Sequence, residues 1–117
     1  MSKEIWRNIP GVEGYQASNL GNIRSNKRVP QADKKNPNSW ISLKAYERVK
    51  GYLAVDVWVD EENRKTMFVH QLVAKAFLDP VKGATSVNHK DKNRVNNNAN
   101  NLQWMTIEEN TSIAQKE

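Results

Sequence analysis

The 117-residue sequence contains no cysteine, which excludes disulfides and any zinc site built on thiolates. It also lacks an apolar run close to the roughly 20 residues that a membrane-spanning helix needs. The first residues contain no apolar core of the kind that a secretory signal peptide carries. These absences favour a protein of the reducing cell interior, and we expect a cytoplasmic location with no membrane partner.

Hydrophobic residues are scarce at 38% of the chain, and much of the polarity is concentrated in residues 26–39 and 88–101. The remaining sequence can therefore still bury one core, as a chain of this size requires. Eighteen Lys and Arg against 13 Asp and Glu give a net charge of +5. This balance favours a polyanionic partner such as nucleic acid, with a solvated basic surface as the alternative.

The sequence of residues 1–45 predicts a small β-rich module that ends in a polar linker. Glycines at positions 11, 14 and 21 separate short stretches around Trp6, Tyr15 and Ile23. This spacing is typical of tight turns between short strands. Residues 19–22 are expected to form the turn that leads into the strand at Ile23.

Residues 46–117 predict a second unit that begins with a hairpin and a helix. Residues 52–59 alternate as a half-buried strand does, and residues 66–69 supply the returning strand. The apolar spacing then changes to that of one helical stripe, which Asp79-Pro80 ends. The members of this stripe are Val69, Leu72, Val73, Ala76 and Phe77.

From residue 86 onward the pattern predicts a strand, a long polar loop, a returning strand at residues 102–104, and a helix. Thr106 and Glu109 form a capping box, which predicts that this helix begins at residue 107. Five of the six residues 96–101 are asparagine. Their amides can rigidify a loop by bonding its backbone, and this structural role explains most of them.

His89 lies at the end of the first of these strands, where a histidine alone is more often structural than catalytic. Its neighbours favour a catalytic role, because Asn88 and Asn110 could both offer oxygen atoms to one hard divalent cation. Mg²⁺ takes oxygen ligands and keeps several waters, so two protein ligands would suffice. Asp91 could assist that site directly or through water.

Four stretches carry a resemblance to a known family: VHQLVAKAF, VNHKDKN, NNNANNLQW and the closing EEN. They resemble the HNH endonuclease family, in particular its phage and intron-associated homing-endonuclease branch. The N-terminal IWRNIPGVEGYQASNLGNIRS is similar to the short modular DNA-binding motif that often precedes the HNH unit. The resemblance implies an α+β fold with a ββα-metal catalytic motif, preceded by a hairpin and helix and by the β-rich module.

The resemblance also implies a role for each matching residue. His89 matches the general base that deprotonates the attacking water, and Asn101 matches the asparagine that anchors the loop and helps to hold that base. Asn88 and Asn110 match two metal ligands, although an aspartate is frequent at the position of Asn88. One Mg²⁺ or Mn²⁺ per active site is implied, with double-stranded DNA as the substrate of a monomer or homodimer.

Other residues are expected to support this site. The predicted DNA contacts, each with a solvated loop as the alternative, are Arg24, Lys27, Arg28, Lys90, Lys92 and Arg94. Packing explains His70 better than a contact to phosphate or to the catalytic hairpin. The expected activity is metal-dependent hydrolysis of DNA in a phage or mobile-element setting. A non-catalytic DNA-binding module is the competing interpretation, and an RNA-binding or structural protein is a more distant one.

Overall fold

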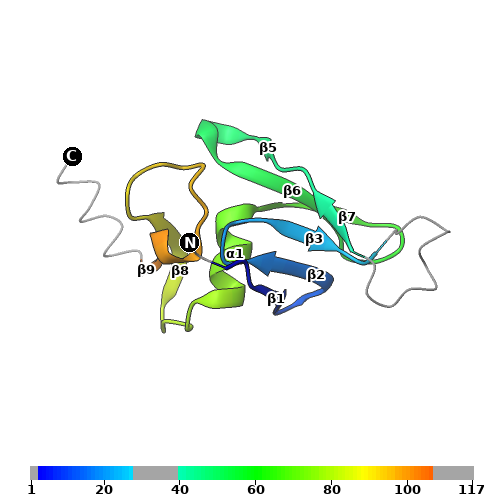
Figure 1. Ribbon diagram of the computed structural model, residues 1–117, viewed down its shortest axis with the longest axis horizontal. Helices are drawn as coiled ribbons and strands as arrows, with labels where there is room; N and C mark the ends of the chain where they lie inside the picture. The colour runs from blue at the N-terminus through cyan, green and yellow to red at the C-terminus, as the bar shows by residue number, and fades with distance from the viewer. Residues whose placement is uncertain (1–2, 28–39, 107–117) are drawn as a thin grey trace.

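A computed structural model describes residues 3–27 and 40–106 of the chain (Figure 1). Its strands and helices in these ranges are β1 (Trp6–Ile9), β2 (Val12–Ser18), β3 (Ile23–Ser25), β4 (Ile41–Leu43), β5 (Tyr46–Glu47), β6 (Leu53–Trp58), β7 (Arg64–Phe68), α1 (Val69–Phe77), β8 (Ala84–His89) and β9 (Leu102–Thr106). Short 3-10 turns, Val49–Gly51 and Ala99–Asn101, precede β6 and β9. The observed class is α+β, as predicted.

The strands form three antiparallel sheets around α1 (Figure 1). The order β1-β2-β3-β4 makes the N-terminal sheet, β5-β6-β7 makes a second sheet, and β8 pairs with β9 alone. Helix α1 contacts strands of all three sheets, so it is the element that joins them. No helix in the described part of the chain has the length and hydropathy that crossing a membrane demands.

One hydrophobic core runs through the N-terminal sheet and the elements that follow it. Tyr15 and Ile23 from the N-terminal sheet are buried together with Val55 of β6 and Leu72 of α1. The Tyr15 hydroxyl also accepts a hydrogen bond of 2.7 Å from the backbone N–H of Trp58, across the two sheets. The N-terminal strands therefore share their core with the helix and hairpin that carry the rest of the fold.

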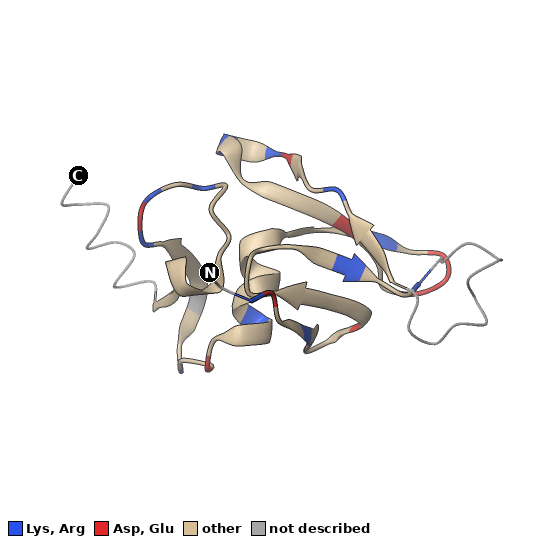
Figure 2. Cartoon of the chain, viewed as in Figure 1, with Lys and Arg blue, Asp and Glu red and all other residues tan. Residues whose placement is uncertain are grey.

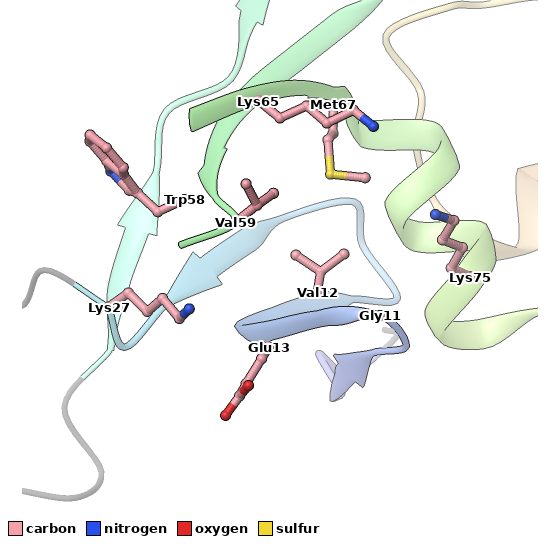
Figure 3. Close-up of a pocket in the computed structure, with 9 residues that line it drawn as sticks. All are labelled: Gly11, Val12, Glu13, Lys27, Trp58, Val59, Lys65, Met67 and Lys75. Carbon is pink, nitrogen blue, oxygen red and sulfur yellow. The ribbon is translucent and has the colours of Figure 1, made fainter. Parts of the chain in front are cut away.

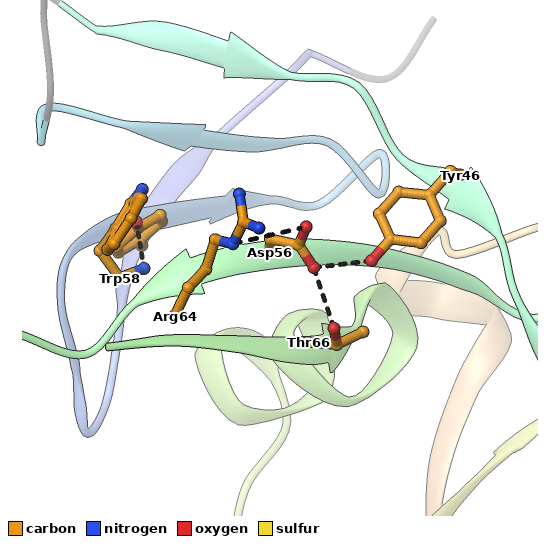
Figure 4. Close-up of polar contacts among 6 residues, drawn as sticks. Tyr46, Asp56, Trp58, Arg64 and Thr66 are labelled. Carbon is orange, nitrogen blue, oxygen red and sulfur yellow. Dashed lines mark hydrogen bonds and ion pairs between the residues drawn. The ribbon is translucent and has the colours of Figure 1, made fainter. Parts of the chain in front are cut away.

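A polar cluster on β6 ties the second sheet together (Figure 4). The Asp56 carboxylate accepts hydrogen bonds from the Tyr46 hydroxyl at 2.6 Å and from the Thr66 hydroxyl at 2.9 Å. The Arg64 guanidinium lies 4.0 Å from its other oxygen. These hydrogen bonds, and then the nearby positive charge, lower the pKa of Asp56 below its usual value. The cluster joins β5, β6 and β7 and contains no catalytic group.

Most predicted elements are observed close to their expected bounds. The strand expected over residues 52–59 spans Leu53–Trp58, and Val59 beyond it is 54% exposed. The helix ends at Phe77 because Leu78 already has an extended backbone, two residues before Pro80. The helix predicted from residue 107 and most of the linker, residues 28–39, lie outside the described residues.

Candidate active site

The β8–β9 hairpin places His89 at the last residue of β8, opposite Leu102. The polar loop of residues 90–101 connects the two strands, and the Lys90 N–H closes it by donating to the Asn101 carbonyl at 2.7 Å. The His89 side chain is only 5% exposed. It is therefore buried at the base of this loop.

The His89 ring is held by a hydrogen bond of 2.8 Å between its Nε2 and Oδ1 of Asn97. A carboxamide oxygen can only accept, so Nε2 carries the hydrogen and Nδ1 carries the lone pair. No residue in the described ranges hydrogen-bonds to Nδ1. The arrangement thus leaves the ring one nitrogen that can accept a proton, and it holds that nitrogen in a defined direction.

Aromatic rings form the wall behind His89. The His70 ring centroid lies 5.0 Å from that of His89, and the Tyr52 centroid lies 5.1 Å from His70 and 5.9 Å from His89. Phe68 completes the cluster at 5.7 Å from His70. The Arg94 guanidinium covers Tyr52 at 4.9 Å and donates to the Lys50 carbonyl, so it clamps the polar loop to this wall.

His70, the second residue of α1, is buried at 6% exposure, and its Nδ1 has no hydrogen-bond partner among the residues that the structure describes. Burial, and to a smaller extent the nearby His89, lower its pKa from 6.5 to about 4. His70 is therefore neutral at pH 7. It packs against His89 without adding a positive charge beside it.

Replacing His70 with phenylalanine is expected to make the protein more resistant to acid. A histidine whose pKa is lowered by folding costs no stability above its unfolded pKa of 6.5, and it destabilises the fold as the pH falls toward about 4. The full effect is up to about 3 kcal/mol, because one pKa unit corresponds to about 1.4 kcal/mol. Urea unfolding of both proteins at several pH values between 7.5 and 4 measures it. Parallel curves for the two proteins would contradict this prediction.

The loop of residues 90–101 is held by side-chain amides. The Asn101 Nδ2 donates to the Asp91 carboxylate and to the Asn96 carbonyl, both at 2.9 Å, and its Oδ1 accepts from the Asp91 N–H at 3.1 Å. The Asp91 carboxylate also accepts from the Asn96 amide and the Asn93 N–H, each at 2.8 Å. These bonds, with Asn96 contributing most, lower the pKa of Asp91. Asn101 and Asp91 together fix the shape of the loop.

The donors available to a metal ion are few. Asn88 precedes His89 on β8, and no described residue hydrogen-bonds to its carboxamide, so its oxygen is available to a cation. Both Asp91 oxygens already accept bonds within the loop, which makes Asp91 a loop anchor. Asn110 lies outside the described residues. The described ranges contain no group of three or more His, Asp or Glu side chains that could together hold a metal ion. The donors that fit here are therefore amide oxygen, water and phosphate, which Mg²⁺ accepts.

Lys and Arg are spread over several elements of the described chain, among them the loop between β8 and β9 (Figure 2). Lys90, Lys92 and Arg94 lie on the exposed loop that follows His89. Arg24 lies on β3, where its guanidinium packs over Trp6 at 4.2 Å and over Trp40 at 4.8 Å and donates to Gln16. Arg28 lies outside the described residues. Of the predicted DNA contacts, those on the loop are the ones beside His89.

Lys27 belongs to a separate pocket of 370 Å³ (Figure 3). The pocket lies between the β1–β2 turn, the end of β6 and helix α1, and Lys65, Lys75 and Glu13 also line it. None of the aromatic residues around His89 takes part in it. Basic side chains therefore gather at a second place, apart from His89.

Comparison with known proteins gives a match for both parts of the chain. The NUMOD4 motif matches residues 4–58, and the HNH endonuclease family matches residues 67–112. The second match contains α1, the β8–β9 hairpin and His89. Residues 67–112 belong to the HNH endonuclease family. This confirms the resemblance on which the predicted fold rested.

Individual members of the family are similar over most of this chain. The DNA endonuclease I-HmuI of Bacillus phage SP01 is 35% identical over 102 residues, which cover 86% of this chain and 52% of I-HmuI. The HNH endonuclease L245 of Acanthamoeba polyphaga mimivirus is 32% identical over 93% of this chain and 29% of its own length. A solved structure titled "DNA binding and cleavage by the HNH homing endonuclease I-HmuI" superposes with a TM-score of 0.75, at 32% identity, over 96% of this chain and 58% of that one. The chain thus spans between 29% and 58% of the length of these HNH relatives.

Two residues of the site were not predicted. Asn97 contacts His89, but nothing in the run of asparagines distinguishes it from its neighbours. Tyr52 contacts both histidines, although the alternation of residues 52–59 placed it on the face opposite to the apolar side chains. The alternation of a strand predicts which side chains share a face. It does not predict which other element will pack against the end of that strand.

Proposed function

We propose that this HNH protein is a DNA endonuclease that hydrolyses phosphodiester bonds with His89 as the general base. The observation that carries the proposal is the hydrogen bond from His89 Nε2 to Asn97, which leaves Nδ1 able to accept a proton. An imidazole accepts a proton near neutral pH, as deprotonation of an attacking water requires. The relatives support DNA as the substrate, since I-HmuI is a DNA endonuclease.

The chain's own residues divide the work in this proposal. His89 accepts the proton of water at Nδ1, Asn97 and the aromatic wall keep the ring in place, and Asn101 shapes the loop over it. Asn88, with Asn110, would hold a divalent cation, which supplies stabilisation of the charge that grows on the phosphate and the leaving oxygen. Lys90, Lys92 and Arg94 would contact the phosphates on either side of the scissile bond.

The protein is further proposed to act inside cells on behalf of a phage or a mobile element. The relatives from a Bacillus phage and from a giant virus support this origin. The positive net charge suits a protein that must find DNA among other solutes.

Supercoiled plasmid incubated with the protein is expected to be nicked in the presence of Mg²⁺ or Mn²⁺ and to stay intact in EDTA. The neutral amide donors of the site hold a cation weakly, so half-maximal cleavage should require a millimolar rather than a micromolar concentration of Mg²⁺, as judged from a metal titration on agarose gels. A plasmid that is shifted in a binding gel but never nicked with either metal would favour the non-catalytic DNA-binding module instead.

A further inference from the structure

We propose that the β2–β3 turn of the N-terminal sheet, residues 19–22, is a positioning element of the active site. It holds the backbone of Asn97, and Asn97 in turn holds His89. The N-terminal sheet would then be needed for turnover at the active site as well as for any contact with DNA. This inference rests on the proposed role of His89 as the general base.

The β2–β3 turn contacts the polar loop of residues 90–101 at two points. The Asn19 carbonyl accepts a hydrogen bond of 2.8 Å from the Ala99 N–H. Gly21 lies directly against Asn97, because a Cβ atom on Gly21 would come within 2.9 Å of the Asn97 carbonyl oxygen and 3.0 Å of its carbonyl carbon. Contacts this short leave no room for a side chain at position 21, and the nearest atoms belong to backbone that cannot rotate away.

The turn itself is firmly held. Ser18 is fully buried, and its hydroxyl oxygen accepts hydrogen bonds from the backbone N–H groups of Leu20 at 3.2 Å and Asn22 at 3.1 Å. The Asn19 side chain accepts from the Ile5 N–H at 2.7 Å, which ties the turn to the segment before β1. A turn held by these hydrogen bonds can fix the position of the loop that packs against it.

Asn97 depends on this support more than its neighbours do. It is 3% exposed, and its Nδ2 is buried without a hydrogen-bond partner in the described part of the chain. Asn101 holds its own part of the loop by three side-chain hydrogen bonds, whereas the Asn97 side chain bonds to His89 alone among the described residues. The position of its Oδ1 is therefore set by its backbone, which lies on Gly21. Because hydrogen bonds weaken over a few tenths of an ångström, a displaced backbone would release the ring.

Gly21→Ala tests the proposal, with Gly11→Ala as its matched control. Both glycines belong to turns of the N-terminal sheet and have positive φ angles, 95° and 80°, so alanine strains the backbone at both. A Cβ on Gly11 would meet nothing within 4 Å, whereas one on Gly21 meets Asn97. We expect Gly21→Ala to lower kcat for nicking by about 10- to 100-fold with KM and DNA affinity little changed. Gly11→Ala should cleave like the wild type.

Nitrogen-15 NMR of the histidine rings provides a readout that does not need activity. The resonances of His89 in Gly21→Ala should change toward a mixture of tautomers, while they stay at the wild-type positions in Gly11→Ala. Asn97→Ala should reproduce the Gly21→Ala spectrum and its loss of kcat, and Asn97→Asp should restore most of both because it keeps an acceptor oxygen. If Gly21→Ala does not fold, Ala99→Pro is the second variant. It removes the N–H that donates to the Asn19 carbonyl and so weakens the contact between turn and loop by a change in the loop.

Equal kcat values and equal His89 spectra for Gly21→Ala and Gly11→Ala would overturn the positioning role. So would a loss confined to DNA affinity, which would mean that the turn serves only DNA binding. A wild-type protein that never nicks DNA but still shows the turn-dependent change at His89 would refute the proposed function and leave the structural coupling intact.

Discussion

His89→Ala is expected to lower the rate of DNA cleavage by about 10²- to 10⁴-fold, the usual contribution of a general base. His89 is the residue at the end of β8 whose Nε2 is held by Asn97, and alanine removes the nitrogen that would accept the proton of water. Plasmid nicking under single-turnover conditions, with enzyme in excess over DNA, measures the chemical step without product release. The same gels report whether any residual activity is metal-dependent.

The binding of DNA should survive this substitution. The basic side chains on the neighbouring loop remain, so the affinity measured by gel shift in EDTA is expected to change less than threefold, which corresponds to about 0.7 kcal/mol. A protein that still nicks at the wild-type rate without His89 would exclude it as the base. The buried His70, 5.0 Å away, would then be the next residue to test.

Asn101→Ala is expected to lower both stability and activity. The substitution removes three side-chain hydrogen bonds, two to Asp91 and one to the Asn96 carbonyl. At about 1 kcal/mol for each bond, and with water able to replace part of the loss at the exposed Asp91, the free energy of unfolding should fall by roughly 2–3 kcal/mol. Chemical denaturation followed by tryptophan fluorescence measures this value. Cleavage should fall by at least about tenfold at a temperature where the variant is still folded, because the loop also carries Asn97.

Asn100→Ala is the matched control for this experiment. Asn100 is the neighbouring residue with the same side chain, but it is exposed, and its side chain makes no hydrogen bond within the described residues. Its substitution should change the unfolding free energy by less than about 0.5 kcal/mol. A similar loss of stability for both variants would show that the asparagine run acts through general loop composition rather than through the bonds of Asn101.

The hairpin and helix of residues 53–77 follow from local patterns, whereas the short strands β4 and β5 were not predicted. Alternation over residues 52–59 and the helical stripe that begins at Val69 depend only on which side chains share a face. The α1 helix was predicted from this stripe, with an end at Asp79-Pro80 that lies slightly beyond its observed end at Phe77, since burying a stripe on a sheet requires no knowledge of distant residues. The position of His89 at the end of a strand followed in the same way.

The contacts inside the site could not be predicted by such patterns. Any of the asparagines in residues 96–101 has the chemistry to hold an imidazole, so composition does not select Asn97. Its selection comes from the path of the loop, which the Asn101 bonds and the β2–β3 turn determine together. The placement of Tyr52 between the two histidines depends likewise on how β6 meets α1 and the hairpin.

By itself, then, the sequence determined the hairpin and helix of residues 53–77 and the place of His89 at a strand end, because these depend on spacing along one segment, while its resemblance to known proteins indicated the family. The tertiary structure alone decided which amide holds that histidine, which rings surround it and which turn of a distant sheet supports the loop. These depend on side chains separated by 8 to about 80 residues that meet only when the shared core of the N-terminal sheet, α1 and Leu102 has formed.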